Sequence, residues 1–194
     1  MNAQLSQKSK TSMMALCGLF AAVTTVCAWI SIPLGFTPVP INLATLAVFL
    51  TGALLGPKYG AISMVVYTLA GAVGAPVFSQ FTGGFGIIAG PTGGYIIGYI
   101  AAAFITGLLI SVLQGNGRVS ASGKQDYFIS IAIYAFAMIC GLAACYALGT
   151  AWFMFSTHTG FAAAMVMCVI PLLPGDAIKI IVATLLARRL KKFI

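Results

Sequence analysis

The 194-residue chain contains two acidic residues, and one of them gives the strongest indication of chemistry. Asp176 lies inside an apolar stretch, and Lys179 follows it three residues later, in the sequence Pro-Leu-Leu-Pro-Gly-Asp-Ala-Ile-Lys at 171–179. Pro174 suits the first turn of a helix, where its missing N–H costs nothing. A helix that starts there places Asp176 and Lys179 on one face, with the carboxylate favoured by the helix dipole.

Such a pair can serve binding or structure. A charged group within a bilayer costs about 3 kcal/mol on insertion scales and usually marks a functional site. The lysine argues for an anionic group on a ligand, and the carboxylate argues for a donor such as an amide or ureido N–H. The alternative is a self-satisfied pair that only anchors the end of its helix.

The composition predicts the environment of this pair. Hydrophobic residues make up 61% of the chain and charged residues 6%, whereas a soluble surface needs roughly 25% charged residues. The chain is therefore predicted to be an all-α integral membrane protein. At about 20 residues for each span, its length supplies a bundle of six transmembrane helices and leaves no room for a soluble domain. We expect a single transmembrane domain, 1–194.

The basic and sulfur-containing residues point to no further function. The net charge of +8 comes from Lys and Arg at the chain ends and in short loops, which is the positive-inside pattern and not a nucleic-acid signal. Five cysteines lie in apolar segments, and no two of them form a C-x-x-C pair. We therefore expect them to be small buried hydrophobic side chains and not the ligands of a metal site. They are Cys17, Cys27, Cys140, Cys145 and Cys168.

Apolar runs and Pro/Gly breaks set the expected helices. Their approximate ranges are 13–30, 41–55, 59–73, 92–113, 127–153 and 174–190. The first run is long enough to span and is predicted to be an uncleaved helix, not a signal peptide. A short helix over 161–169 is expected to dip into the outer leaflet. The Gly-rich and Phe-rich stretch 74–91 is too apolar for an ordinary loop, so it should pack back into the protein or line a cavity.

The distribution of Lys and Arg predicts the orientation. The basic groups on one side of a six-helix count are Lys8 with Lys10, Lys58, Arg118 with Lys124, and the C-terminal cluster Arg188, Arg189, Lys191 and Lys192. The loops 31–40, 75–91 and 156–160 carry no Lys or Arg and fall on the other side. Both termini are therefore expected in the cytoplasm, with Asp176 near the outer face.

At that outer face we expect a lidded cavity, because two Pro/Gly-rich loops and the start of the last helix converge there. A largely apolar pocket with a few polar groups is the general form of a small-molecule site. The expected aromatic wall is Phe78, Phe81, Phe85 and Tyr95, and the expected polar groups are Asn42, Thr45, Gln80, Thr82 and Thr92. Taken singly, each Phe could instead be an ordinary packing residue.

The sequence lacks the residues and motifs that hydrolytic and ATP-driven enzymes need. The chain has no Glu, one His, no Walker-type phosphate loop and no H-E-x-x-H. Three classes remain open. A binding subunit that takes its energy from a partner fits the short chain best. A stand-alone proton-coupled carrier of a small carboxylate, with Asp176 titrating during transport, is the alternative. The third is a non-transporting membrane scaffold.

Four segments carry a resemblance to a known family. They are Thr-Pro-Val-Pro-Ile-Asn-Leu-Ala-Thr-Leu-Ala-Val at 37–48, Gly-Ala-Leu-Leu-Gly-Pro-Lys-Tyr-Gly at 52–60, Gly-Gly-Phe-Gly-Ile-Ile-Ala-Gly-Pro-Thr-Gly-Gly-Tyr at 83–95, and the stretch 171–179. Together they resemble the BioY family, the biotin-binding substrate subunits (S components) of energy-coupling factor (ECF) transporters. The resemblance implies a six-helix bundle that holds one biotin near the outer face and needs no cofactor. It also implies a prokaryotic cell membrane and, as partners, a transmembrane coupling protein and two ABC-type ATPases.

The resemblance also implies particular site residues. Asp176 and Lys179 would take part in biotin recognition, and from their charges we expect Lys179 to meet the valerate carboxylate and Asp176 the ureido N–H groups. The loop before Gly90–Tyr95 would cover the ligand. The full predicted set of biotin contacts is Asp176, Lys179, Asn42, Thr45, Phe81, Gly84, Phe85, Thr92 and Tyr95. Gly18 and Ala22 on the first helix would dock the coupling protein.

Overall fold

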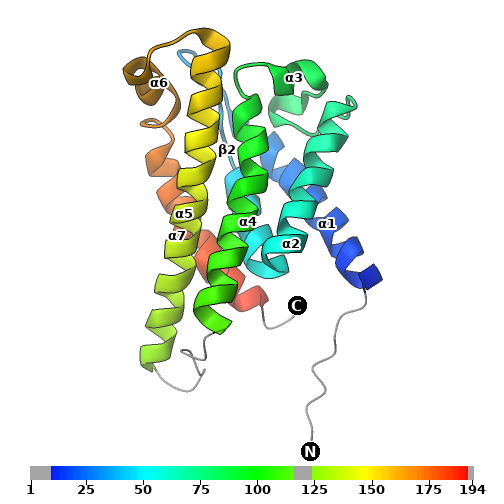
Figure 1. The fold of residues 1–194 in the computed structure, drawn as a ribbon, viewed down its shortest axis with the longest axis vertical. Coiled ribbons are helices and arrows are strands. Elements are labelled where there is room, and N and C mark those ends of the chain that lie inside the picture. Colours follow the sequence, from blue (N-terminus) through cyan, green and yellow to red (C-terminus); the bar gives the residue numbers. More distant parts are fainter. Residues whose placement is uncertain (1–9, 116–123, 192–194) are drawn as a thin grey trace, which may run out of the picture.

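Helices dominate the fold. The structure of the chain is a computed structural model that describes residues 10–115 and 124–191. The helices are α1 (Lys10–Trp29), α2 (Ala44–Ala72), α3 (Phe85–Ala89), α4 (Gly93–Gly115), α5 (Lys124–Thr157), α6 (Phe161–Cys168) and α7 (Leu173–Leu190), with a 3-10 turn η1 (Ser79–Phe81). Two short strands, β1 (Ser31–Ile32) and β2 (Ile41–Asn42), pair antiparallel. The all-α prediction is confirmed apart from this pair, which the sequence analysis did not anticipate (Figure 1).

α2 contains a reversal of the chain. Gly56 has non-helical dihedrals (φ 76°, ψ −177°) and is followed by Pro57. A Cβ built on Gly60 would lie 3.1 Å from the Cα of Gly52, whereas eight residues of continuous helix would separate the two by about 12 Å. The segments before and after Gly56 therefore fold back on each other, as predicted for 41–55 and 59–73. The first segment starts at Ala44 and not at 41, because residues 41 and 42 pair with β1.

The long helices have the length and composition of membrane spans. Within the described residues, four helices meet these criteria, and α6 and α7, bent by 52° relative to each other, add a fifth when counted as one span. Their outward faces are apolar. On α7, for example, Ile178, Ile181 and Leu185 are exposed at helical spacing. In a multi-pass membrane protein such faces contact lipid, so their exposure here involves no water.

α4 is the central helix and lies close to both α2 and α5. A Cβ built on Gly94 would lie 2.3 Å from the Cβ of Trp152, and one on Gly98 would lie 3.1 Å from the Cα of Cys145. Further along, Thr106 Oγ1 donates a hydrogen bond of 3.4 Å to the carbonyl of Ala137. This face of α4 therefore packs directly against α5, since only small side chains allow so close an approach.

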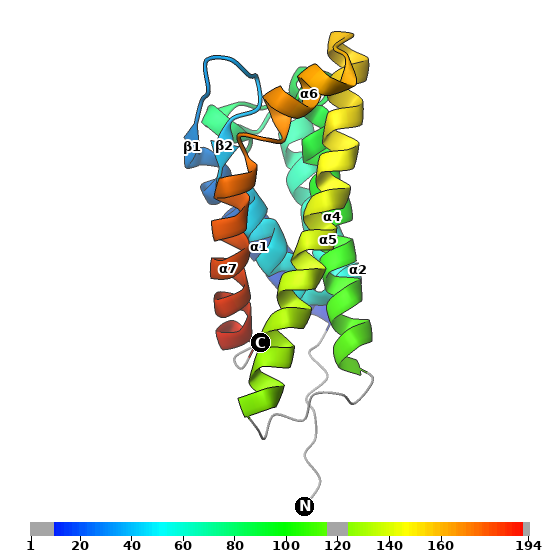
Figure 2. The same cartoon turned by 90° about the vertical axis from the view of Figure 1, so that its left-hand side faces the viewer.

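The two ends of the bundle differ in character. The first turn of α1 and the last turn of α7 lie at one end (Figure 1), where Lys191 Nζ donates to Gln114 Oε1 at 2.7 Å and joins α7 to α4. α3, α6 and the loop between the strands gather at the opposite end (Figure 2). Of the basic groups used for the predicted orientation, Lys8, Arg118 and Lys192 lie outside the described residues, as does the side chain of Lys124.

Candidate functional site

The irregular segment 73–92 folds back as a roof over one end of the bundle. The Phe78 ring packs over Gly71, where a Cβ would lie 2.0 Å from the ring. The backbone N–H of Gly84 donates to the carbonyl of Gly71 at 2.7 Å, and that of Phe78 donates to Thr82 at 2.9 Å. These contacts satisfy polar backbone groups that would otherwise be unpaired in an apolar environment, as expected for this segment.

Two tryptophans fix this roof to the ends of the helices. Trp29, at the end of α1, donates its indole N–H to the carbonyl of Pro76 at 2.8 Å. Trp152, near the end of α5, donates to the carbonyl of Gly90 at 3.0 Å. The roof is thus held near both of its ends by indole groups from different helices.

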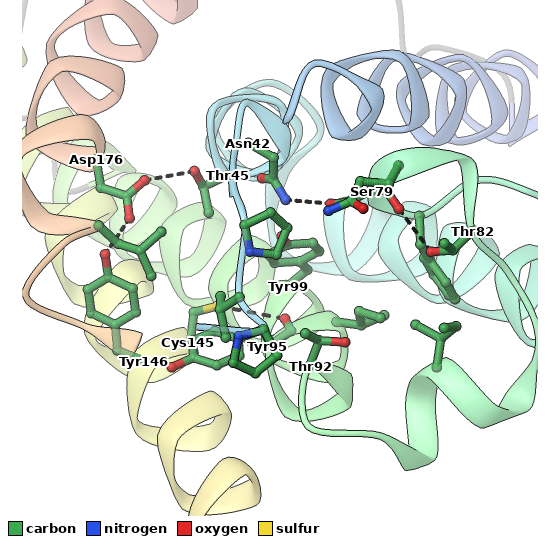
Figure 3. Close-up of a pocket in the computed structure, with 18 of the residues that line it drawn as sticks. Asn42, Thr45, Ser79, Thr82, Thr92, Tyr95, Tyr99, Cys145, Tyr146 and Asp176 are labelled. Atoms are coloured by element: carbon green, nitrogen blue, oxygen red, sulfur yellow. Dashed lines mark hydrogen bonds between the residues drawn. The ribbon is translucent and has the colours of Figure 1, made fainter. Parts of the chain in front are cut away.

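A cavity of about 230 Å³ lies beneath the roof, just below the roughly 300–1,000 Å³ usual for small-molecule sites. Its wall comes from the β2 region, α2, the roof, α4, α5 and the start of α7. The lining residues are Pro38, Val39, Pro40, Asn42, Thr45, Tyr67, Phe78, Ser79, Gln80, Thr82, Ile87, Thr92, Tyr95, Ile96, Tyr99, Cys145, Tyr146, Leu172, Asp176 and Lys179. Many of these are drawn in Figure 3.

The only ion pair found among the described residues lies in this wall. Lys179 Nζ and Asp176 Oδ1 are 2.7 Å apart, and the two residues are 5% and 1% exposed. Asp176 belongs to the first turn of α7, as predicted. Thr45 donates to Asp176 Oδ1 at 3.0 Å and accepts from Lys179 Nζ at 3.1 Å. Tyr146 donates its hydroxyl to Asp176 Oδ2 (Figure 3).

This network neutralises two charges in an apolar surrounding. Both carboxylate oxygens accept hydrogen bonds, so the cost of burying Asp176 is offset. The ammonium group of Lys179 has three N–H donors, and its hydrogen bonds within the described residues go to Asp176 and Thr45. The pair thus carries no net charge, yet it borders the cavity with a donor and an acceptor side by side.

A second polar group lies away from the ion pair. Asn42 Nδ2 donates to Ser79 Oγ at 2.7 Å, and Asn42 Oδ1 accepts from the backbone of Ala44 at 3.0 Å. The first bond joins β2 to the roof, and the second satisfies a donor at the start of α2. Figure 3 shows Ser79 and Thr82 across the cavity from Asp176 and Tyr146.

Tyrosine rings form the wall between these two groups. The ring centroids of Tyr67 and Tyr99 are 6.4 Å apart. The ring centroids of Tyr95 and Tyr146 are 6.5 Å apart, and the angle between the two ring planes is 78°. Tyr95 OH also shares a hydrogen bond of 3.2 Å with Thr150 of α5. This middle part of the cavity can pack the apolar body of a ligand.

The predicted contact residues divide into two groups. Those that line the cavity are Asp176, Lys179, Asn42, Thr45, Thr92 and Tyr95. Phe81, Gly84 and Phe85 are not part of its wall. Phe81 is 63% exposed and stacks on Trp29 at 4.8 Å, and Phe85 is 72% exposed. Gly84 has φ 102° and precedes α3, so its place is in the turn of the roof.

Tyr146, Ser79 and Tyr99 are among the wall residues that the sequence did not predict. Tyr146 contacts the carboxylate of Asp176 but lies 30 residues from it, and Ser79 lies 37 residues from its partner Asn42. No spacing rule links such positions. Tyr99 could have been predicted from the sequence, because it follows Tyr95 by four residues and shares its helix face.

The predicted docking residues lie on the outer surface of α1. Gly18 and Ala22 are both exposed, and a Cβ built on Gly18 has no neighbour within 4 Å.

All five cysteines are free, and the described residues hold no cluster of three or more potential metal ligands.

Comparison with known proteins gives a consistent match over the chain. The model of the BioY family matches residues 1–194. "Biotin transporter BioY" of Thermotoga maritima is 42% identical over 175 residues, which are 90% of this chain and 93% of that protein. "Probable biotin transporter BioY" of Pyrococcus horikoshii is 38% identical over 182 residues, which are 94% of this chain and 98% of that protein.

A solved structure has the same fold. It is described as the S-component for biotin from an ECF-type ABC transporter, and it matches with a TM-score of 0.82 and 28% sequence identity. The match covers 97% of this chain and 95% of that one.

Proposed function

The chain belongs to the BioY family, and we propose that it binds biotin in the cavity beneath the roof for uptake into the cell. The observation that carries this function is the buried pair of Asp176 and Lys179 in the cavity wall. It offers a donor and an acceptor to a polar ligand, while the tyrosine wall offers an apolar surface. Biotin has both features, since a ureido ring is joined to an apolar ring and chain.

The proposed biotin contacts are the predicted residues that reach the cavity. Asp176, Lys179 and Thr45 form one polar group, and Asn42 and Thr92 line other parts of the cavity wall. Tyr95 supplies part of the aromatic wall. We include Tyr146, because its hydroxyl holds the Asp176 carboxylate.

Energy for uptake comes, in this proposal, from an ECF module of a transmembrane coupling protein and two ABC-type ATPases. The similar solved structure is an S-component of an ECF-type ABC transporter. The exposed positions Gly18 and Ala22 leave α1 smooth enough for another helix to approach closely. The chain itself is proposed to bind and carry, with no catalytic role and no cofactor.

The proposed topology has six crossings of a prokaryotic cell membrane and both termini in the cytoplasm, within one domain of residues 1–194. Counting the parts of α2 before and after Gly56 separately, and α6 with α7 as one, raises the number of spans to six. Lys10, Arg188 and Arg189 belong to the helix ends that share one side of the bundle. The positive-inside rule then assigns that side to the cytoplasm and the cavity to the outside.

Uptake of labelled biotin tests this function. Cells that lack their own biotin transport should accumulate biotin when they produce this chain with a coupling module. Accumulation should stop on ATP depletion and survive an uncoupler. Uptake that survives ATP depletion and stops with the uncoupler would instead support a proton-coupled carrier that uses Asp176.

A further inference from the structure

The roof end of the bundle, built by the segments 30–43, 73–92 and 155–173, contains no formal charge. These segments have no Asp, Glu, Lys or Arg, whereas segments of this combined length in a soluble protein would carry about a dozen charged residues. The opposite end of the bundle carries Lys10, Arg188 and Arg189. The roof end therefore lacks the composition of a surface that faces water.

Large apolar side chains are exposed at the roof end. Five phenylalanines of these segments are each more than half exposed: Phe36, Phe81, Phe85, Phe155 and Phe161. They belong to the loop between the strands, to the roof, and to the adjoining ends of α5 and α6. Figure 2 shows the strands and α6 on different sides of the roof end. An exposed apolar surface of this kind marks contact with a membrane or with another protein.

Lipid fits this surface better than a protein partner does. The exposed rings surround the roof end and do not form one patch, so a protein on one side would leave the others uncovered. The lipid-facing sides of the spanning helices also continue into this end without a charged residue between. Exposed Val26 of α1 is followed by exposed Ile30 and Ile32, and exposed Leu173 of α7 is preceded by exposed Ile170.

The two tryptophans near this end direct their polar groups inward. A tryptophan at a membrane surface has an apolar ring and a polar N–H, and the N–H is usually at the wet side. Trp29 donates its N–H to the carbonyl of Pro76 at 2.8 Å, and Trp152 donates to that of Gly90 at 3.0 Å. Both N–H groups thus bind the protein and need no water.

Hydroxyl groups of the roof end are also paired within the protein. Thr82 donates to the carbonyl of Ser79 at 2.9 Å, and Thr157 donates to that of Phe153 at 2.7 Å. Thr159 shares a hydrogen bond of 2.7 Å with the hydroxyl of Thr157. Internal pairing of polar groups is the condition for a segment in contact with lipid, because hydrocarbon offers no hydrogen bonds.

We infer that the roof end lies inside the lipid leaflet on its side of the membrane, where acyl chains and glycerol groups, and not water, contact its exposed rings. This surface is separate from the cavity wall and from the outer face of α1, so the inference goes beyond the proposed function and requires no biotin. The cavity beneath the roof then opens at the depth of the lipid headgroups, and a ligand reaches it through that layer.

Thiol labelling in lipid nanodiscs tests where the exposed rings lie. The full chain, in nanodiscs of phosphatidylethanolamine and phosphatidylglycerol, is reacted with a charged maleimide, which reaches both membrane faces from water. Phe85→Cys and Phe161→Cys place a thiol in the roof and on α6, and Lys58→Cys, at an exposed lysine, is the water-facing control. Because only the thiolate reacts and a thiol in lipid stays protonated, the first two variants should label at least about a hundredfold more slowly than Lys58→Cys.

Two further measurements complete the labelling experiment. The unsubstituted chain, with its five free cysteines, gives the background rate, and labelling in dodecyl sulfate confirms that each new thiol is present. Fluorescence of Phe85→Trp identifies what covers the ring. In nanodiscs whose lipids are brominated near the glycerol end of the acyl chains, the emission that this variant adds to the unsubstituted chain should be quenched.

Two results would overturn the inference. If either Phe85→Cys or Phe161→Cys labels within about tenfold of Lys58→Cys, the roof end faces water. If both label slowly but the bromine atoms do not quench Phe85→Trp, protein and not lipid covers the rings. Biotin binding by Phe85→Cys is measured on the same sample. Since Phe85 is outside the cavity wall, that binding reports on the proposed function alone, and either claim can fail without the other.

Discussion

At the scale of single residues, Asp176 is held by side chains from three helices. Lys179 lies on its own helix α7, Thr45 on α2 and Tyr146 on α5. A carboxylate with this many partners is fixed in direction before a ligand arrives. Such preorganisation reduces the entropy that binding would otherwise have to overcome.

Removing one partner of the pair should be worse for stability than removing both. We expect Lys179→Met to destabilise the ligand-free protein by about 3–5 kcal/mol, because a buried carboxylate is left uncompensated. Asp176→Leu combined with Lys179→Met should restore part of that loss. Thermal unfolding in detergent measures both variants, with Lys58→Met at an exposed lysine as the control. A double variant that is less stable than the single one contradicts this account.

Tyr146→Phe tests whether the orientation of the carboxylate matters for the ligand. The variant keeps the ring and deletes the hydroxyl that donates to Asp176. A hydrogen bond to a charged group contributes about 1.5–3 kcal/mol, so biotin should bind at least about tenfold more weakly. Tyr134→Phe, at a tyrosine buried elsewhere on α5, is the matched control and should bind normally. Equal affinity in the two variants would remove Tyr146 from the site.

The sequence predicted one half of this network and missed the other for a physical reason. Asp176 and Lys179 share a helix face at a spacing of three residues, and two charged residues within an apolar stretch are easily recognised in the sequence. The contact of Tyr146 with Asp176 depends on how α5 packs against α7. Nothing in the local pattern around Tyr146 carries that information.

At the scale of elements, the roof segment 73–92 determines access to the cavity. Its residues Phe78, Ser79 and Gln80 line the cavity, while its neighbour Phe81 stacks on Trp29 at 4.8 Å. Gln80 and Phe81 both have positive φ, 60° and 57°, an uncommon backbone conformation for such residues. The Trp29 contact helps to hold this turn in place.

Loosening that contact should speed the release of biotin. A stacked aromatic pair contributes about 1 kcal/mol beyond its buried area, so Phe81→Ala should raise the dissociation rate roughly fivefold. Phe85→Ala, at an aromatic residue of the same segment that is 72% exposed and outside the cavity wall, is the matched control. Stopped-flow displacement of labelled biotin measures both rates. Equal rates in the two variants would mean that this contact does not control access.

The elements also show where sequence patterns carry information and where they do not. The break at Gly56 and Pro57 was predicted, because backbone geometry restricts the residue type at such a position. The segment 74–91 was expected only as an irregular stretch that packs inward. Its short helix α3 and the turn at Gln80 depend on contacts with Trp29 and Gly71, which are distant in sequence.

At the scale of the whole molecule, the cavity and the proposed docking face belong to different parts of the bundle. The cavity wall lies near α3 and the roof, whereas Gly18 belongs to the half of α1 that starts at the opposite end. Binding of biotin and coupling to a partner should therefore be separable by mutation.

A large side chain on the outer face of α1 should block uptake and spare binding. Gly18→Leu places bulk where no neighbour lies within 4 Å, so the fold and the biotin affinity should be unchanged. Uptake by cells that also make the coupling module should fall at least about tenfold, because close helix approach needs small residues. Ala143→Leu, at an exposed position of α5, is the control. If both variants transport normally, the docking face lies elsewhere.

Calorimetric titration of biotin into the purified chain, beside the Asp176→Asn variant, shows whether the buried carboxylate is needed to bind biotin. The substitution keeps the shape of the side chain and removes the charge that Lys179, Thr45 and Tyr146 surround. We expect tight binding of one biotin for each wild-type chain, and a loss of at least about a hundredfold in affinity for a folded Asp176→Asn, in line with about 3 kcal/mol for a buried charge partner. Equal affinity in both proteins, or no binding by the folded wild type, would contradict it.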